Sequence, residues 1–328
     1  MSLLAIENLQ VHFQTADGVN RAVDGLSLSV EAGETVAIVG ESGCGKSVTS
    51  MSVLRLLPER NTAIAGRIRF AGRDLLGLSE REMRGVRGNE ISMIFQEPMT
   101  SLNPVLTIGR QIREAISLHE KASAAAMNDR AREMLALVGI PAPERRLTEY
   151  PHQLSGGMRQ RVMIAIALAC NPKLVIADEP TTALDVTIQA QILELLLDIQ
   201  RRSGTAILLI THDLGVVAEV ARRVVVMYAG RKVEEAPATS LFGRPLHPYT
   251  EGLLAAVPTL GSAAERPSRL AEIPGMVPSL KQKIRGCVFA NRCPKAAAVC
   301  ADMAPALEEK IPGHFAACHF SARERLPA

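Results

Sequence analysis

Gly40-Glu41-Ser42-Gly43-Cys44-Gly45-Lys46-Ser47 is the stretch that decides the fold of this chain. It matches the pattern G-x-x-x-x-G-K-[ST] at every fixed position and follows the apolar run 36–39, which predicts a buried parallel strand. Its glycines let the backbone curl so that N–H groups point inward at an anion, and the helix expected from Lys46 adds the positive end of its dipole. Strand, loop and helix together predict an α/β fold with a phosphate-binding loop.

The same loop predicts how a nucleoside triphosphate is held. We expect Lys46 to neutralise the β- and γ-phosphates and the hydroxyl of Ser47 to ligate Mg²⁺. The other residues expected to bind ATP are Gly40, Ser42, Gly43, Cys44, Gly45 and Val48. The alternative is a glycine-rich turn without a ligand, against which the four fixed positions and the preceding strand argue.

A second apolar run, 174–177, ends in two carboxylates, Asp178 and Glu179. In enzymes with such a phosphate-binding loop, the acid at this kind of strand end holds Mg²⁺, often through water, which is the role expected of Asp178. Glu179 is then placed to accept a proton from the water that attacks the γ-phosphate. A solvated strand end is the alternative, and the loop upstream argues against it.

Ser155-Gly156-Gly157 opens a long apolar segment and predicts a helix N-terminus with exposed amides, a second anion site. One nucleotide has only one γ-phosphate, so two cradles suggest a head-to-tail pair of similar domains, each completing the other's site. Taken alone, Ser-Gly-Gly favours the simpler interpretation of a capped helix start.

Together with further segments, these motifs occur in the order and spacing of the ATP-binding cassette of ABC transporters, which the chain resembles. The set comprises Gly40 to Ser47, Gln96, Leu154 to Gly157, Asp178-Glu179, Ala183-Leu184-Asp185 and His212. More narrowly, segments 92–104, 150–158, 183–191 and 247–250 resemble the ATPase subunits of dipeptide and oligopeptide importers. The resemblance covers nearly the whole chain, with Met158 where the family signature often has Gln.

The resemblance implies roles that spacing alone leaves open. Gln96 would contact Mg²⁺ or the attacking water, and His212 would hydrogen-bond the γ-phosphate. Asp185 would lie in a loop that crosses to the partner's catalytic site. The Ser155 to Gly157 signature would contact the nucleotide bound by the partner. Phe13 would stack on adenine. The alternatives are a polar strand end for Gln96, a structural histidine, and a core or surface phenylalanine.

The chain divides by pattern into an α/β cassette over residues 1–256, with a mixed sheet, and a C-terminal extension over 257–328 that is Pro-rich and largely irregular. Apolar residues at helical spacing predict a helical subdomain over about 97–165. They are Ile108, Ile112 and Ile116, then Ala131, Leu135 and Val138. In the resembled family this subdomain receives the coupling helix of a transmembrane subunit.

The extension holds four of the six cysteines, namely Cys287, Cys293, Cys300 and Cys318. Clustered thiols in a protein inside the cell favour metal or redox chemistry over disulfides. Four thiolates are the usual complement of a [4Fe–4S] cluster, which the resemblance also implies, and the absence of C-x-x-C pairs argues weakly against zinc. Zinc and reduced thiols packed as small apolar groups remain the alternatives.

Composition limits the partners. The net charge is +3 with no basic block, which indicates no nucleic-acid footprint. The longest apolar stretch, 162–170, is too short to cross a bilayer, and the N-terminal residues lack the pattern of a signal peptide. We therefore expect a peripheral ATPase on the cytoplasmic face of the bacterial inner membrane. Two permease subunits would form the pore. These subunits and an extracytoplasmic binding protein would select the substrate.

The function expected from these observations is ATP-driven import of dipeptides or oligopeptides. ATP would close a dimer with a paralogous ATPase, and hydrolysis through Glu179 would reopen it. Import of nickel, glutathione or another small solute is one alternative. Others are a remodelling factor acting on ribosomes or DNA, and a metal-sensing regulator.

Overall fold

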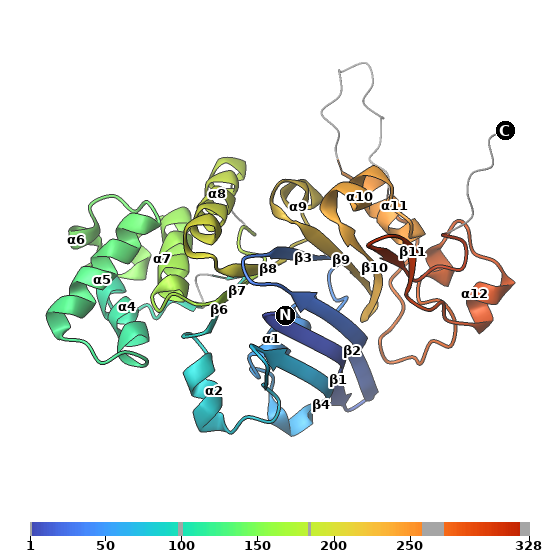
Figure 1. Ribbon diagram of the computed structural model, residues 1–328, viewed down its shortest axis with the longest axis horizontal. Helices are drawn as coiled ribbons and strands as arrows, with labels where there is room; N and C mark the ends of the chain where they lie inside the picture. Colours follow the sequence, from blue (N-terminus) through green and yellow to red (C-terminus); the bar gives the residue numbers. More distant parts are fainter. Residues whose placement is uncertain (1, 98–100, 183–184, 258–271, 322–328) are drawn as a thin grey trace, which may run out of the picture. The chain divides into compact units, whose positions relative to one another are not determined.

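The computed structural model describes residues 2–97, 101–182, 185–257 and 272–321 (Figure 1). The chain forms two compact units, each built from discontinuous segments. The first unit contains Met1–Leu3, Val30–Thr35 and Asp74–Ile210. The second contains Leu4–Ser29, Val36–Arg73 and Thr211–Ala328, and so includes the C-terminal extension.

The first unit holds three parallel strands in the order β8-β7-β6. They are β6 (Ile91–Ile94), β7 (Leu174–Asp178) and β8 (Ala206–Ile210). All their residues are buried, as the continuous apolar runs predict. Helices α2 (Glu80–Val86) and α8 (Val186–Ser203) belong to the same unit, and Gly204 caps the C-terminus of α8 in the left-handed conformation.

The helical subdomain also lies in the first unit. It contains α4 (Ile108–Ser117), α5 (Ala124–Leu137), α6 (Pro143–Arg146), η2 (Pro151–Gln153) and α7 (Gly156–Leu168). Helices α4, α5 and α7 lie side by side (Figure 1). Ile108, Ile112 and Ile116 form the buried face of α4, so the helical spacing in the sequence is confirmed there.

One sheet of the second unit has the order β2-β1-β4-β5. Its strands are β1 (Leu4–Thr15), β2 (Gly18–Val30), β4 (Thr62–Phe70) and β5 (Arg73–Asp74). β1 and β4 pair antiparallel, with Leu4 opposite Phe70 and Phe13 opposite Thr62. The register shifts between Glu7 and Gln10, so a bulge interrupts β1.

The remaining strands of the second unit follow the order β11-β12-β10-β9-β3. They are β3 (Thr35–Val39), β9 (Arg223–Tyr228), β10 (Arg231–Pro237), β11 (Glu308–Ile311) and β12 (His314–Ala316). β3 pairs parallel with β9, and the other neighbours pair antiparallel, so the arrangement is mixed as predicted. β3 is entirely buried and leads into the phosphate-binding loop.

The second unit contains α1 (Lys46–Val53), η1 (Glu59–Asn61), α9 (Leu214–Val220), α10 (Ala238–Gly243), α11 (Pro248–Ala255), η3 (Ala290–Arg292) and α12 (Ala298–Asp302). Helix α1 ends at Val53, before Pro58. The core of this unit includes Tyr228, Tyr249 and Phe289, whose ring centroids lie 4.6 to 5.4 Å apart.

The extension is less irregular than its sequence indicates. Over residues 272–321 it is mostly loop, but β12 pairs antiparallel with β10, placing Glu234 opposite Ala316. β11 and β12 span only four and three residues, too few to show an alternating pattern. The boundary at residue 257 stays a prediction.

Within the described parts of the chain, helices long and apolar enough to cross a bilayer are absent.

Candidate functional site

The phosphate-binding loop depends on glycine at two places where the chain passes very close to other backbone. Gly40 has φ +148°, and a Cβ there would meet the carbonyl oxygen of Met227 at 2.2 Å. Gly45 has φ +102°, and its Cβ would meet the carbonyl oxygen of Ala22 at 2.3 Å. Side chains are excluded at both positions, so the loop can keep this curled path only with glycine.

Lys46 lies inside the loop with 5 % of its surface exposed. Its ammonium donates to the carbonyl oxygens of Gly40 at 2.8 Å and Glu41 at 3.1 Å. It also lies 3.9 Å from the sulfur of Cys44, and burial raises the pKa of that thiol despite the nearby ammonium. The loop thus offers a positive charge without an opposing thiolate, which suits an anionic ligand.

Gln96 and Glu179 meet in the first unit. The side-chain amide of Gln96 donates to Oε2 of Glu179 at 3.0 Å, and the hydroxyl of Thr182 donates to the same oxygen at 2.9 Å. Glu179 has φ +46°, and its N–H donates to the carbonyl oxygen of Ile210 at 2.8 Å. The role of Thr182 is not predicted from the sequence, because its hydroxyl reaches Glu179 through the turn that Glu179 makes at φ +46°.

Asp178 ends strand β7 and is buried, with 3 % of its surface exposed. It therefore lies where a carboxylate is expected at the carboxyl end of a parallel strand, in the first unit together with Gln96 and Glu179. Carboxylate and amide oxygens are suited to Mg²⁺.

His212 is exposed and belongs to the second unit. It directly follows Thr211, whose N–H donates to the carbonyl oxygen of Ile38 at 3.3 Å. Ile38 lies on β3, the strand that leads into the phosphate-binding loop. His212 therefore follows a residue that is hydrogen-bonded to this strand. Phe13 is half-buried near the end of β1. Its contact with adenine stays a prediction.

Ser155 caps α7, because its hydroxyl accepts the N–H of Met158 at 3.3 Å. The helix start expected from the sequence is confirmed. Gly156 is exposed with open space where a Cβ would lie, whereas a Cβ at Gly157 would approach the side chain of Ile188 at 3.0 Å. The hydroxyl of Ser155 serves its own helix here, and the second anion site stays a prediction.

Asp185 caps α8 by accepting the N–H of Ile188 at 2.9 Å. Its crossing to a partner's site stays a prediction. Ala183-Leu184, which precede it in the same motif, lie outside the described residues, as do positions 98–100 of the segment after Gln96.

All six cysteines of the chain are free thiols, including the four of the extension. Burial raises the pKa of Cys287 and of Cys293, and neighbouring cysteines of the set, Cys300 and Cys318, raise both further. The N–H of Cys287 donates to the carbonyl oxygen of Cys300 at 2.8 Å. In the part of the chain that the structure covers, however, no three His, Cys, Asp or Glu side chains are placed to hold a metal ion.

The sequence pattern of the family described as "ABC transporter" matches residues 23–182, and that of "Oligopeptide/dipeptide transporter, C-terminal region" matches residues 233–300. The probable peptide ABC transporter ATP-binding protein y4tR of Sinorhizobium fredii is 59% identical over 317 residues, 96% of this chain and 94% of that protein. The chain belongs to the ABC transporter family of ATP-binding proteins.

Two further comparisons agree with this membership. The dipeptide transport ATP-binding protein DppD of Bacillus subtilis is 53% identical over 96% of this chain and 94% of its own length. Among solved structures, a dimer of the ATP-binding cassette MJ0796 in a post-hydrolysis state, bound to ADP and Pi, matches with a TM-score of 0.65 at 28% identity. That match covers 72% of this chain and 98% of the cassette, so the fold is that of an ABC ATPase.

Proposed function

We propose that this protein is the ATP-hydrolysing subunit of an importer of dipeptides and oligopeptides. The observation that carries the proposal is a family pattern for the oligopeptide and dipeptide transporter C-terminal region on the same chain as an ABC cassette. Relatives named for peptide and dipeptide transport, similar over nearly the full length, support the same substrate class. Nickel, glutathione and other solutes, and remodelling of ribosomes or DNA, are less well supported because no relative named here concerns them.

ATP with Mg²⁺ supplies the phosphoanhydride bond whose cleavage drives the cycle. Lys46 and the loop amides hold the phosphates. The Mg²⁺ ion is held by Ser47, Gln96 and Asp178. Glu179 accepts the proton of the attacking water, and His212 hydrogen-bonds the γ-phosphate. Gln96 and Thr182 donate to Glu179 Oε2 and so orient this base.

The working unit is a pair of cassettes. Ser155, Gly156, Gly157 and Asp185 act on the nucleotide held by the partner, which in this proposal is a paralogous ATPase. The exposure of Ser155 and Gly156 and the dimeric state named for the MJ0796 cassette support this. The pair docks at the cytoplasmic face of the inner membrane on two permease subunits, which receive peptide from an extracytoplasmic binding protein. A ligand bridging two cassettes favours the closed state by its differential affinity.

The extension holds a [4Fe–4S] cluster in this proposal, through Cys287, Cys293, Cys300 and Cys318. The mutual approach of these thiols supports it. Zinc is the weaker alternative, because the four cysteines lack the C-x-x-C pairs that are typical of structural zinc sites.

The substitution Glu179→Gln tests the ATPase proposal. It should leave ATP binding intact, abolish phosphate release and trap ATP-bound dimers. Glutamine has nearly the same size and shape as glutamate but does not accept the proton. Phosphate release and sedimentation with and without ATP are the measurements, with the partner ATPase co-expressed. Glu194→Gln, at an exposed position of α8, is the matched control and should hydrolyse ATP as the wild type does.

Undiminished phosphate release by Glu179→Gln would remove Glu179 from the role of base. Wild-type protein that binds no ATP, or binds it equally well after Lys46→Ala, would refute the ATPase function itself. Peptide uptake by the reconstituted transporter, compared with nickel and glutathione, tests the substrate class.

A further inference from the structure

Arg292, in the extension, forms a two-point ion pair with a residue of the phosphate-binding loop. Its Nη1 lies 2.6 Å from Oε2 of Glu41 and its Nη2 lies 3.0 Å from Oε1. The Arg292 side chain is 5% exposed and that of Glu41 is 28% exposed. Planar pairing of this kind is the strongest form of arginine–carboxylate contact. The extension and the loop are therefore joined directly, although the two residues are 251 positions apart.

Arg292 is itself fixed before it reaches the loop. Its Nε donates to the carbonyl oxygen of Pro274 at 3.0 Å, and Nη2 also donates to that of Ile273 at 3.0 Å. Nη1 lies 3.3 Å from the hydroxyl of Tyr228. With its donors shared among neutral oxygens and one carboxylate, the guanidinium has a single defined position.

Glu41 is held at its backbone as well. Its N–H donates to the hydroxyl of Tyr249 at 2.8 Å, and Tyr249 belongs to the segment 247–250, to which the ATPase mechanism assigns no role. Tyr249 packs against Tyr228 and Phe289 in the core of the second unit. Residues that follow the cassette motifs in the sequence thus fix both the amide and the carboxylate of Glu41.

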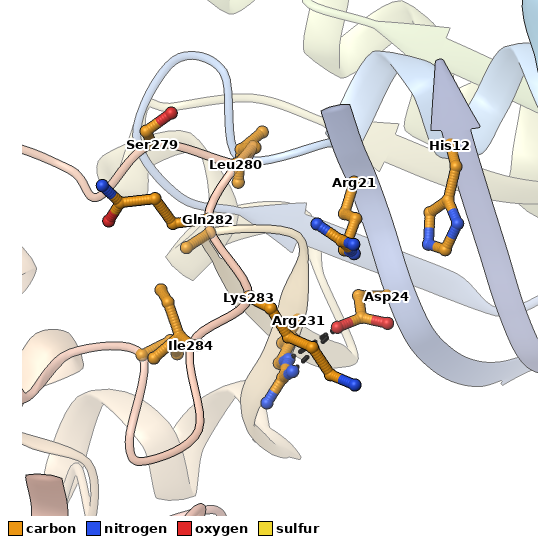
Figure 2. Close-up of a pocket in the computed structure, with 11 residues that line it drawn as sticks. His12, Arg21, Asp24, Arg231, Ser279, Leu280, Gln282, Lys283 and Ile284 are labelled. Atoms are coloured by element: carbon orange, nitrogen blue, oxygen red, sulfur yellow. Dashed lines mark hydrogen bonds and ion pairs between the residues drawn. The ribbon is translucent and has the colours of Figure 1, made fainter. Parts of the chain in front are cut away.

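The extension is anchored on the strands beside this contact. A cavity of about 220 Å³ is lined in part by His12 on β1, Arg21 and Asp24 on β2, and Ser279, Leu280, Gln282, Lys283 and Ile284 of the extension. Figure 2 shows these side chains. The N–H of Arg21 donates to the carbonyl oxygen of Leu280 at 3.0 Å, and its Nη1 donates to that of Lys281 at 3.2 Å. Lys281 also pairs with Asp17 at 3.0 Å. The segment that carries Arg292 is thereby held to the same unit as the loop.

The charge of Glu41 poses a problem for a loop that must receive a triphosphate. An unpaired carboxylate here would repel the nucleotide, because few water molecules screen charges around a partly buried group. We propose that Arg292 is a positioning residue that neutralises Glu41 and fixes it in the loop, so that nucleotide affinity depends on the folded extension. This inference rests on the proposed function, in which the loop binds ATP.

Equilibrium binding of a fluorescent ATP analogue to the full-length chain tests the inference. Arg292→Gln should weaken binding about tenfold, because Glu41 is left as an uncompensated charge beside the phosphates. The double variant Arg292→Gln with Glu41→Gln should bind within about threefold of wild type, since the repelling charge is gone. Under saturating ATP the turnover number of Arg292→Gln should stay close to wild type while its KM rises, because the reacting groups are untouched.

Two variants serve as controls. Arg292→Lys keeps the positive charge but cannot pair with Glu41 at two points, so its affinity should lie between those of Arg292→Gln and wild type. Lys295→Gln breaks another ion pair of the extension, with Glu251 on α11 at 2.6 Å, and should not change affinity because this pair does not reach the loop. Thermal unfolding of every variant reports whether the fold is kept.

Wild-type affinity in a folded Arg292→Gln variant would overturn the inference, as would a double variant that binds no better than the single one. If Arg292→Gln does not fold, the variant Glu41→Gln is measured in its place. Its affinity for the ATP analogue should equal or exceed that of wild type. A tenfold loss of affinity would refute the inference. Failure of the proposed function has a different signature, since wild-type protein would then not bind the analogue.

Discussion

At the residue scale, His247 is a side chain whose protonation state is determined by its burial in the second unit. The residue is 1% exposed, and its side-chain Nδ1 accepts the backbone N–H of Tyr249 at 3.1 Å. The backbone N–H of His247 donates to Oε2 of Glu234 at 3.0 Å. Burial lowers the pKa of His247 to about 4, against the opposing influence of Glu234 and Glu251. A neutral imidazole is therefore part of the folded state and caps α11.

This pKa predicts a loss of stability in mild acid. Between pH 6.5 and about 4 the unfolded chain binds a proton at His247 that the native chain does not, so the free energy of unfolding falls as the pH falls. Across that window the contribution of this residue is roughly 3 kcal/mol. Urea unfolding at pH 7.0, 5.5 and 4.5 should show a shallower pH dependence for His247→Asn, which keeps a side-chain acceptor for the cap.

His152→Asn is the matched control, because His152 is exposed on η2, and its pH dependence should follow that of wild type. Equal slopes for wild type and His247→Asn would contradict the prediction.

At this scale the sequence identifies residues such as Lys46 and Gly45, because phosphate binding requires these residue types at this spacing. It does not identify the residues that hold functional side chains in position. Thr182 reaches Glu179 only because the chain turns at φ +46°, and Arg292 reaches Glu41 from 251 positions away. A single sequence contains no periodic signal for contacts of that separation.

At the scale of elements, the most predictable parts are those buried on every side. Strands β3, β7 and β8 are continuous apolar runs, and α4 and α8 carry clear helical stripes. β1 is harder to predict, because a bulge near Asn8, which has φ +48°, divides its alternation into two short stretches. The alternation therefore does not predict the full length of β1, which is a strand of twelve residues.

At the start of α7, one substitution should affect the stability of the chain and its ATP hydrolysis in different ways. Gly156 is helical and exposed, and a Cβ there would meet nothing within 4 Å, so Gly156→Ala should leave the free energy of unfolding unchanged or raise it by up to about 1 kcal/mol. If the partner's nucleotide approaches these amides, the methyl group should reduce ATP hydrolysis of the assembled pair at least tenfold. Chemical unfolding and phosphate release measure the two effects.

Gly85 is the control for that prediction, since it is also exposed and helical, on α2, with nothing within 4 Å of a Cβ. Gly85→Ala should hydrolyse ATP as wild type does. Full hydrolysis by the Gly156→Ala pair would show that the helix start is only a cap.

At the scale of the whole molecule, each of the two compact units contains residues named in the proposed mechanism. Lys46, Ser47 and His212 belong to the second unit, and Asp178 and Glu179 to the first. The extension belongs to the second unit with the phosphate-binding loop, which agrees with its direct contact to Glu41. Composition suggests an appendage, but β12 pairs with a cassette strand, so this part of the chain is built into the fold.

In the proposal, the thiols of the extension hold an iron–sulfur cluster. Protein purified without oxygen should then contain about four irons and four acid-labile sulfides per chain, because four thiolates are the usual complement of such a cluster and its binding would displace their protons. Cys287→Ser should remove most of the iron and lower the melting temperature of the chain. Cys170→Ser, at a buried thiol directly after α7 and outside the set, should keep the full iron content. One equivalent of zinc without iron in the wild type would refute the cluster and leave a zinc site, since zinc needs the same deprotonated thiols.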